Sequence, residues 1–323
     1  MSANEIAIKV NRRVLTLSNP NKVLYPGGRV VKAQVLDYYL RAGPFLLPHF
    51  KNRPVTLLRY PDGVFGESFY EKNAPGFTPN WVKTFKVPRS EGGTIDYILI
   101  NNLPTLAWLA NLAALELHPF LHKVPNIDRP THVVFDLDPG EGVDILGAAE
   151  IAFLIRDLLE GLRLKSFAKV SGSKGIQLYV PLNRAVTYDM TSAFARAVAN
   201  LLSRKHPDRV VSEMAKVFRK GKVFIDWSQN SQTKTTIGSY SLRAKRERPF
   251  VSMPVTWSEL KSAIRRSSPA SLAFEPEAAL KRLNKLGDLF EPVLQLKQQL
   301  PAELTQAVHS MQDTKRLNRY VAQ

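Results

Sequence analysis

The chain has 323 residues, no cysteine, and a formal net charge of +17 from 45 Lys and Arg against 28 Asp and Glu. Its 44% hydrophobic and 23% charged content is typical of a globular protein of one large domain or two small ones, which excludes a disordered chain. The absence of cysteine excludes disulfide scaffolds, zinc fingers, iron–sulfur clusters and thiol catalysis. The excess of positive charge favours a polyanionic partner, with a basic surface that only aids solubility as the alternative.

The sequence gives no sign of a membrane protein. No apolar run approaches the ~18 residues that span a bilayer, and the first 13 residues are too polar for a signal peptide. We therefore expect a soluble, cytoplasmic protein, associated with the nucleoid and without a membrane partner.

Hydrophobic spacing and the positions of Pro and Gly predict the elements of the first half. In chain order they are a strand within 6–17, a turn at Asn19-Pro20, a helix over 32–48, an irregular segment over 61–100 that ends in a strand at 97–100, and a helix over 105–117.

The second half alternates strands and helices without the regular order of a doubly wound sheet. The predicted elements are a strand at 132–137, a helix over 143–162, strands at 165–170 and 176–180, a helix over 190–205, a strand at 222–227, and mostly helical, polar residues over 257–323. This order predicts an α+β fold with a central mixed or antiparallel sheet flanked by helices.

The most informative segment is FDLDPG, in which Asp136 and Asp138 stand near the end of a predicted strand. Alternate side chains of a strand share a face, so the two carboxylates lie about 7 Å apart on one side. Like charges this close favour a bound cation, and hard divalent ions take carboxylate oxygens. A turn built on Asp-Pro-Gly is the alternative.

A third carboxylate, Asp226, ends the apolar strand KVFID. Three carboxylates that share two metal ions are an arrangement used in phosphoryl transfer. The sequence alone leaves open whether Asp226 lies beside Asp136 or only caps a local turn with Asn230.

Two further features suit a phosphate ligand. The loop SGSKG (171–175) joins two strands, and its glycines, hydroxyls and Lys174 can surround an anion, although a solvated hairpin is the alternative. The segment 213–248 carries nine Lys or Arg and three acids, with Trp227 and Tyr240 among them, and a solvated face is again the alternative.

FDLDPG, SGSKG, KVFIDWSQN and YSLR, in this order, resemble the polymerase domain of bacterial ligase D, a member of the archaeo-eukaryotic primase superfamily that acts in non-homologous end joining. The resemblance runs from about Asn19 to Trp257 and includes NKVLYP, FYEKNAP, ALELH and VSMPVTW. It implies a primase-like catalytic domain over 1–260, whose 1–60 part carries a 5′-phosphate pocket. A C-terminal helical segment, 261–323, would pack on the same domain.

The resemblance also implies roles for individual residues. The metal-binding catalytic triad would be Asp136, Asp138 and Asp226. Nucleotide-binding positions would be His118, Ser171, Ser173, Lys174, Gln177, Lys216, Gln229 and Arg243. The pocket for a DNA 5′-phosphate would be Asn19, Lys22 and Lys32, and contacts to DNA or template would come from Arg59, Phe69, Tyr70 and Arg219.

One position departs from the family pattern. Where the family has SGSKG, an apolar residue and then His, this chain has Gln177. Glutamine cannot give the charge-assisted hydrogen bond of a protonated His, a loss of about 1–2 kcal/mol in contact with phosphate. We therefore expect weakened catalysis or nucleotide affinity.

The resemblance implies a template-directed DNA-directed polymerase that prefers ribonucleotides, uses two divalent ions (Mn²⁺ over Mg²⁺), and fills breaks and short gaps bearing a 5′-phosphate. Its partners would be DNA ends, gapped duplex, NTPs or dNTPs, Ku, and an ATP-dependent DNA ligase that is fused or separate, with an end-bridging dimer on DNA as a further expectation. The alternatives are an end-binding module with weakened polymerase activity, a primase-polymerase, and a metal-dependent nuclease.

Overall fold

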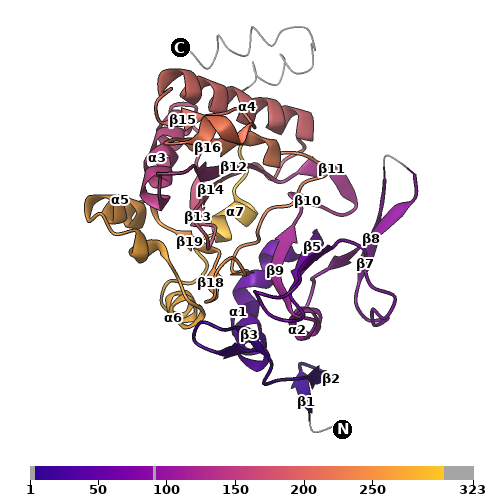
Figure 1. The fold of residues 1–323 in the computed structure, drawn as a ribbon. Coiled ribbons are helices and arrows are strands. Elements are labelled where there is room, and N and C mark those ends of the chain that lie inside the picture. The colour runs from indigo at the N-terminus through magenta and orange to yellow at the C-terminus, as the bar shows by residue number, and fades with distance from the viewer. Residues whose placement is uncertain (1–3, 90–91, 302–323) are drawn as a thin grey trace. The chain divides into compact units, whose positions relative to one another are not determined.

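The computed structural model describes residues 4–89 and 92–301. These fold into two compact units whose segments interleave along the chain (Figure 1). The first unit comprises Met1–Val124, Thr235–Met253 and Phe274–Asp288, and the second comprises Pro125–Lys234, Pro254–Ala273 and Leu289–Gln323. The boundary at residue 260 stays a prediction, and residues 302–323 of the expected C-terminal segment lie outside the described residues.

The described residues of the first unit form short strands and three helices. Its strands are β1 (Glu5–Val10), β2 (Arg13–Ser18), β3 (Val23–Tyr25), β4 (Val30–Val31), β5 (Pro54–Arg59), β6 (Phe69–Glu71), β7 (Thr84–Pro88), β8 (Thr94–Leu99), β9 (Ala114–Pro119), β10 (His122–Lys123), β17 (Leu242–Arg243) and β18 (Phe250–Val251). Its helices are α1 (Lys32–Phe50), α2 (Leu103–Asn111) and α6 (Pro276–Leu286). The main sheet is antiparallel, in the order β6-β5-β8-β7, with β9 also paired to β5.

Helix α1 forms the core of this unit and holds two distant segments in place. The buried Tyr38 donates a hydrogen bond to the carbonyl of Tyr240 at 2.7 Å. The buried Tyr39 donates to the carbonyl of Leu115 at 2.7 Å and accepts from the amide of Leu242 at 3.1 Å. The bonds of Tyr39 therefore hold β9 and β17, which are far apart in the sequence, against α1.

Three sequence predictions for this unit are wrong in detail. The predicted strand within 6–17 is a hairpin of β1 and β2, because Asn11 adopts a left-handed backbone (φ +53°) and turns the chain. The predicted helix over 105–117 ends with α2 at Asn111. Ala113 then turns the chain (φ +56°) into β9, whose backbone pairs with β5. The segment 61–100, expected to be irregular up to its last strand, also contains β6 and β7.

The second unit contains a six-stranded mixed sheet in the order β15-β16-β12-β14-β13-β19. Its strands are β11 (Asn126–Pro130), β12 (His132–Pro139), β13 (Phe167–Val170), β14 (Ile176–Pro181), β15 (Val210–Val211), β16 (Val223–Asp226) and β19 (Met253–Val255). Its helices are α3 (Ile145–Gly161), α4 (Tyr188–Lys205), α5 (Trp257–Arg265) and α7 (Glu291–Gln295), with 3₁₀ helices η1 (Lys216–Arg219), η2 (Trp227–Gln229) and η3 (Pro269–Leu272). The predicted α+β class with a mixed sheet is confirmed.

Alternation along β12 separates the core from the polar face of this sheet. Phe135 and Leu137 are fully buried, and the Phe135 ring packs edge-on against Phe194 of α4 at 6.3 Å. Burying an aromatic side chain of this size stabilises the fold by about 1.5–3 kcal/mol. Asp136 and Asp138, the alternate residues, therefore project from the face opposite α4.

No helix in residues 4–89 and 92–301 is both long enough and apolar enough to cross a membrane.

Candidate functional site

A row of polar side chains crosses the sheet of the second unit on one face. Asp136 of β12 pairs with Gln177 of β14 on one side and with Asp226 of β16 on the other, and Gln177 pairs in turn with Lys169 of β13. Residues directly opposite in antiparallel strands share a face, with Cβ atoms about 4.5–5.5 Å apart. The register therefore places Asp226 beside Asp136, the adjacency that the sequence left open.

The electrostatics of this row centre on Asp136. Burial, and then the negative charges of Asp138 and Asp226, raise the pKa of the Asp136 carboxyl to about 7. A hydrogen bond of 3.0 Å from Gln177 Nε2 to Asp136 Oδ2 and the positive charge of Lys169 act in the opposite direction. Lys169 has no exposed surface, and its ammonium lies 5.6 Å from the centre of the Tyr179 ring. The row thus concentrates negative charge that one buried cation balances only in part.

Asp226 is oriented by the residues that follow it. Its Oδ1 accepts hydrogen bonds from the amide (3.0 Å) and hydroxyl (2.5 Å) of Ser228, and its Oδ2 accepts one from Gln229 Nε2 at 2.9 Å. The hydroxyl of Ser228 also accepts a hydrogen bond from Lys234. These bonds fix the Asp226 carboxylate at the start of η2.

The chemistry of the row fits a hard divalent cation, because its donors are carboxylate oxygens. The side-chain positions, however, do not form a finished metal site: in the described part of the chain no group of three or more His, Asp or Glu is arranged to hold a metal ion. The hydrogen bonds from Gln177, Ser228 and Gln229 occupy oxygens that a metal would use. The predicted metal roles of Asp136, Asp138 and Asp226 therefore stay predictions.

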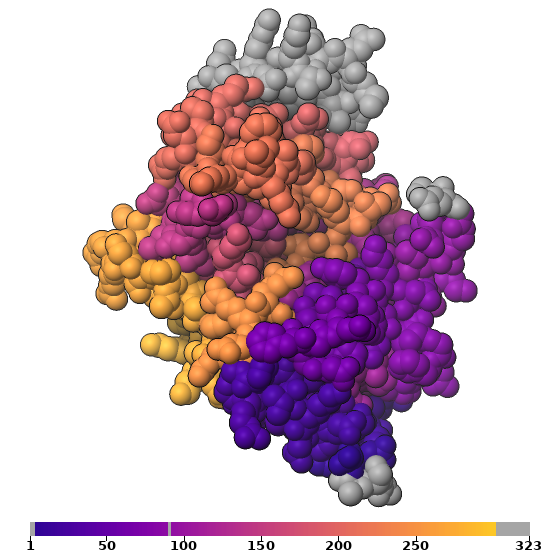
Figure 2. Space-filling model, viewed as in Figure 1, coloured from indigo at the N-terminus to yellow at the C-terminus, as the bar shows by residue number. Residues whose placement is uncertain are grey.

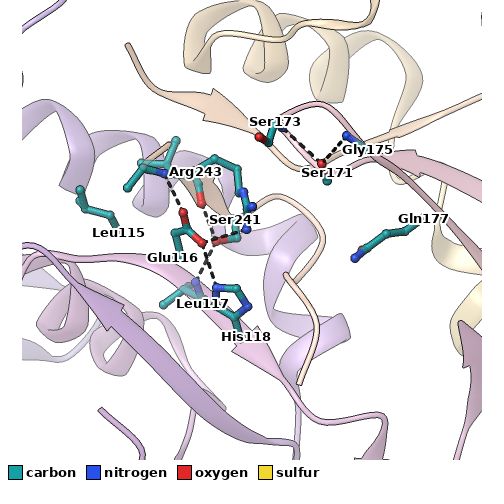
Figure 3. A network of polar contacts seen from close by, with 12 residues as sticks. Leu115, Glu116, Leu117, His118, Ser171, Ser173, Gly175, Gln177, Ser241 and Arg243 are labelled. Atoms are coloured by element: carbon teal, nitrogen blue, oxygen red, sulfur yellow. Dashed lines mark hydrogen bonds and ion pairs between the residues drawn. The ribbon is translucent and has the colours of Figure 1, made fainter. Parts of the chain in front are cut away.

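The SGSKG loop lies against this row. Ser171 Oγ accepts hydrogen bonds from the amides of Ser173 (3.3 Å) and Gly175 (3.2 Å), which curl the loop around the serine (Figure 3). A Cβ added at Gly175 would stand 2.7 Å from the carbonyl oxygen of Leu137 and 3.4 Å from Asp138 Oδ1, so only glycine allows the loop so close to β12. Lys174 is exposed at the tip of the loop.

The segment between β15 and β16 carries Lys216 and Arg219. The Arg219 guanidinium lies 3.7 Å from the centre of the Phe224 ring, and its Nη2 donates to the carbonyl of Met214 at 2.6 Å. Phe224 pairs with Asp138 in the sheet, so Arg219 covers the face that carries the carboxylates. A Cβ at Gly140 would stand 1.7 Å from the carbonyl oxygen of Arg219, which explains the glycine of FDLDPG.

In the first unit, His118 and Arg243 meet at a residue that the sequence analysis did not select, Glu116. His118 Nε2 lies 3.0 Å and Arg243 Nη1 lies 2.9 Å from Glu116 Oε2, and the amide of Ala244 donates to Oε1 at 2.9 Å. Figure 3 shows the carboxylate between the two side chains, with β9 held by a bond from the Leu117 amide to the Ser241 hydroxyl. Glu116 and His118 are two residues apart on one strand, and this shared face was the available signal.

Fixed partners keep Glu116 ionised although it is only 1% exposed. Burial alone raises the pKa of the Glu116 carboxyl, but the hydrogen bond from His118, the charges of Arg243 and His118, and the Ala244 amide together lower it to about 2. Arg243 keeps its buried Nε without a hydrogen bond to any described residue. This donor remains available for a ligand.

The residues predicted to bind a 5′-phosphate are brought together at the start of α1. The amide of Lys22 donates to the carbonyl of Asn19 at 3.0 Å, and the amide of Lys32 donates to the carbonyl of Lys22 at 2.9 Å. The buried Lys32 Nζ donates to Asn111 O at 2.8 Å and to Ser18 Oγ at 3.1 Å, whereas Lys22 Nζ pairs with Asp62 at 2.6 Å. Burial, and then the positive charges of Lys22 and Arg59, lower the pKa of Lys32 to about 8. An anion bound here would relieve that repulsion.

The predicted DNA contacts of β5 and β6 also cluster. The Arg59 guanidinium lies 5.2 Å from the centre of the Phe69 ring and pairs with Glu71 at 3.1 Å. Phe69 and Tyr70 are 44% and 63% exposed, and the Tyr70 ring lies 6.4 Å from that of His118. Exposed aromatic side chains of this kind suit stacking on nucleic-acid bases.

The predicted site residues thus form separate groups. The second unit brings together Asp136, Asp138, Asp226, Gln177, Gln229 and the SGSKG loop, and the first unit contains the His118–Arg243 cluster and the Lys22–Lys32 cluster. Lys169 was missed because it stands among apolar residues of its strand, and only strand pairing places it beside Gln177. Glu116 was missed because two of its partners, Arg243 and Ala244, lie far away in the sequence.

Comparison with solved structures defines the class of this fold. The chain is similar to the "Polymerase Domain from Mycobacterium tuberculosis Ligase D in complex with DNA", with a TM-score of 0.80 and 40% sequence identity over 87% of this chain and 98% of that chain. The class is therefore a primase-type polymerase domain. Its fold is the archaeo-eukaryotic primase fold, here with a carboxylate row on the central sheet.

Sequence comparison narrows the class further. Residues 31–290 match the family described as "LigD, primase-polymerase domain". The chain is 42% identical over 279 residues to the "Multifunctional non-homologous end joining protein LigD" of Mycolicibacterium smegmatis, and 33% identical over 274 residues to the "Bifunctional non-homologous end joining protein LigD" of Bacillus subtilis. These matches cover 86% and 84% of this chain but 36% and 43% of the relatives.

The chain belongs to the LigD primase-polymerase domain family, whose members are metal-dependent, DNA-directed nucleotidyltransferases.

Proposed function

We propose that this chain extends primers at DNA double-strand breaks and short gaps during non-homologous end joining, preferring ribonucleotides. The observation that carries the proposal is the strand register that sets Asp226 beside Asp136, on the face that also presents Asp138 to the SGSKG loop. A carboxylate row next to a glycine-rich loop joins a cation-binding surface to a phosphate-binding one.

The residues of the second unit would position both the metal and the triphosphate. Asp136, Asp138 and Asp226 would hold two divalent ions, with Mn²⁺ preferred to Mg²⁺. When bound, the metal supplies charge neutralisation at the phosphates and activation of the attacking 3′-hydroxyl. Gln177 orients Asp136, and Ser228 and Gln229 orient Asp226, through the hydrogen bonds described above. Ser171, Ser173, Lys174 and Lys216 would contact the triphosphate.

In the first unit, Glu116 would hold His118 and Arg243 in fixed orientations as nucleotide contacts. The unpaired Nε of Arg243 supports this role, because a buried donor without an acceptor favours a ligand that supplies one. Asn19, Lys22 and Lys32 would hold the 5′-phosphate of the downstream strand, while Arg59, Phe69, Tyr70 and Arg219 would contact DNA or template. Ku, a DNA ligase and an end-bridging second copy are the proposed partners.

Extension of a primer on gapped duplex DNA tests the proposal, with four rNTPs compared with four dNTPs in Mn²⁺ and in Mg²⁺. We expect extension that is strongest with rNTPs and Mn²⁺, and that falls at least about 10³-fold in Asp136→Ala. Asp208→Ala, which removes an exposed carboxylate of the same unit, is the matched control and should keep full activity. Robust extension by Asp136→Ala would refute the proposal.

The 5′-phosphate pocket has its own test. Lys22→Ala should weaken binding to a gap with a 5′-phosphate about tenfold more than binding to a gap with a 5′-hydroxyl. Lys51→Ala, an exposed lysine at the far end of α1, should reduce both equally and slightly. Equal losses on both DNAs in Lys22→Ala would make Lys22 a general backbone contact.

A second candidate function is an end-binding module with weakened chemistry. It is favoured by Gln177, whose amide donates to an oxygen of Asp136 that a metal would use. This candidate predicts 5′-phosphate-dependent DNA binding by the wild-type chain without extension in either metal.

A further inference from the structure

The second unit contains a cavity away from the carboxylate face. Its volume is about 580 Å³, within the range of ligand pockets, and it lies between α4 and the loop that follows β15. Helix α4 contributes Arg196, Asn200 and Arg204, the loop contributes residues 212–215, and Trp227 completes the wall. Figure 1 shows α4 beside β15 and β16, at the edge of this sheet. The surface of α4 and of the strands β15 and β16 is salmon to orange in Figure 2.

The cavity and the carboxylate row are on different faces of the sheet. Phe135 packs on Phe194 of α4, so α4 covers the face opposite Asp136. Trp227 comes directly after Asp226, and the Arg196 guanidinium lies over its ring, 5.0 Å from the ring centre. The indole Nε1 donates to the carbonyl of Ser212 at 3.2 Å, which fixes the ring in the cavity wall.

The lining selects for an anion that also has a flat aromatic group. Arg196 and Arg204 form no ion pair with any described residue, in contrast to Arg156 and Arg209 of the same unit, which pair with carboxylates. Among the described residues that line the cavity, Glu213 is the one acid beside Arg196 and Arg204, so these residues carry a net positive charge. Guanidinium groups without partners bind phosphate, and an indole–guanidinium stack offers a surface for a base.

The residues that follow the cavity wall along the chain also expose apolar and aromatic side chains beside cationic ones. After Ala215 of the cavity wall, η1 exposes Val217 (78%) and Phe218 (55%). Exposed apolar and aromatic side chains next to cations are the pattern of single-strand binding surfaces.

We propose that this cavity binds an unpaired nucleotide of a single-stranded DNA segment, its base against the Arg196–Trp227 stack and its phosphates on Arg196 and Arg204. The choice of nucleic acid as the ligand rests on the proposed function. The site itself needs neither the carboxylates nor a metal. A strand held here would contact the wall that carries Trp227, the residue after Asp226.

The first measurement is binding of a single-stranded oligothymidylate of about eight nucleotides with a 5′-hydroxyl end, in EDTA, by fluorescence anisotropy. The 5′-hydroxyl avoids the Lys22–Lys32 cluster, and EDTA removes any dependence on catalysis. Arg196→Gln/Arg204→Gln should lower affinity about tenfold and reduce the slope of log affinity against log salt by about 1.4, the value for two phosphates. Arg265→Gln/Arg266→Gln removes the same charge from exposed positions at the end of α5 and should change affinity less than about twofold.

The second measurement locates the strand. An oligothymidylate with 5-iodouracil should photocrosslink to Trp227 or Met214, identified by mass spectrometry of tryptic peptides, and Arg196→Gln/Arg204→Gln should remove that crosslink. Crosslinks confined to Phe69 and Tyr70, or equal affinity losses in both double variants, would overturn the inference. Binding of free ATP but not of the oligonucleotide at these arginines would overturn the assignment to a strand. Loss of primer extension with this binding intact would refute only the proposed function.

Discussion

Two buried carboxylates of this protein, Glu116 and Asp136, have pKa values that are shifted in opposite directions. Glu116 is buried among fixed donors, so its pKa falls to about 2, whereas Asp136 is surrounded by Asp138 and Asp226, so its pKa rises to about 7. Burial acts in the same direction on both. The neighbouring groups therefore decide the direction of each pKa shift. The charge of Glu116 is balanced by its ion-pair partners, whereas the carboxylates around Asp136 lack positive charge that a ligand can supply.

The largest effect should follow replacement of the satisfied carboxylate. Glu116→Gln leaves the His118 and Arg243 contacts without a negative charge, and breaking a buried pair of this kind lowers stability by about 3 kcal/mol. Chemical denaturation at pH 7 measures this difference. Asp96→Asn, a half-buried carboxylate of the same unit, is the control and should change stability by less than about 1 kcal/mol. A loss no larger than that of the control would contradict the assignment of Glu116 as an ion-pair centre.

The same pair should show itself in the pH dependence of stability. The pKa of Glu116 is lower in the folded chain (about 2) than its ordinary value of 4.5, so its contribution is complete above about pH 4.5 and is lost as the pH falls toward 2. The shift corresponds to about 3 kcal/mol. The stability difference between wild type and Glu116→Gln, followed by denaturation from pH 7 to pH 2.5, should therefore shrink only below about pH 4.5. A difference that stays constant across this range would disprove the linkage.

Replacement of the Asp136 carboxylate should change stability in the opposite direction. Asp136→Asn keeps an acceptor for Gln177 and removes one of three neighbouring negative charges, so stability in EDTA should rise by about 1 kcal/mol. Addition of Mn²⁺ should stabilise the wild type more than the variant, because the variant keeps only two of the three carboxylates that attract the ion. Thermal unfolding with and without Mn²⁺ measures both effects. Destabilisation of Asp136→Asn in EDTA would show that the row is as well compensated as Glu116.

The smallest effect concerns the position next to Asp136. Gln177→His introduces the residue that the resemblance to the family implies at this position and allows a charge-assisted hydrogen bond to phosphate, worth about 1 kcal/mol. We expect primer extension to rise several-fold, mainly through tighter nucleotide binding. Gln177→Leu can form a hydrogen bond neither to Asp136 nor to phosphate. This variant should reduce extension and serves as the comparison. Unchanged extension in Gln177→His would remove this position from the causes of any weak activity.

The sequence predicted local structure well where the hydrophobic periodicity and the positions of Pro and Gly agree. The predicted helices over 32–48, 143–162 and 190–205 appear as α1, α3 and α4, and the strands at 132–137 and 222–227 appear as β12 and β16. The failures have a common cause. Helical spacing of leucines continued past Asn111, but the backbone of β9 pairs with β5, and long-range pairing outweighs local propensity.

The candidate site divides along the same line. Alternation in one strand already put Asp136 and Asp138 on one face, because the side-chain period of a strand is two. No local rule could place Asp226 or Lys169, since each depends on which strand lies beside which, and none could bring Arg243 to Glu116. The nucleotide, 5′-phosphate and DNA roles were read from motifs and stay predictions, although their residues do cluster within each unit.

The amino-acid sequence by itself determined the α+β class, the family motifs and the pair of neighbouring acids, because these follow from spacing along the chain. Tertiary structure alone decided that Asp226 completes the row, that Glu116 joins His118 to Arg243, and that Arg196 meets Trp227 in a cavity behind the sheet. The contacts of Asp136 with Asp226, of Glu116 with Arg243 and of Arg196 with Trp227 join residues from tens of positions to more than a hundred apart. Only the register of paired strands and the packing of helices on them bring these side chains within range of each other.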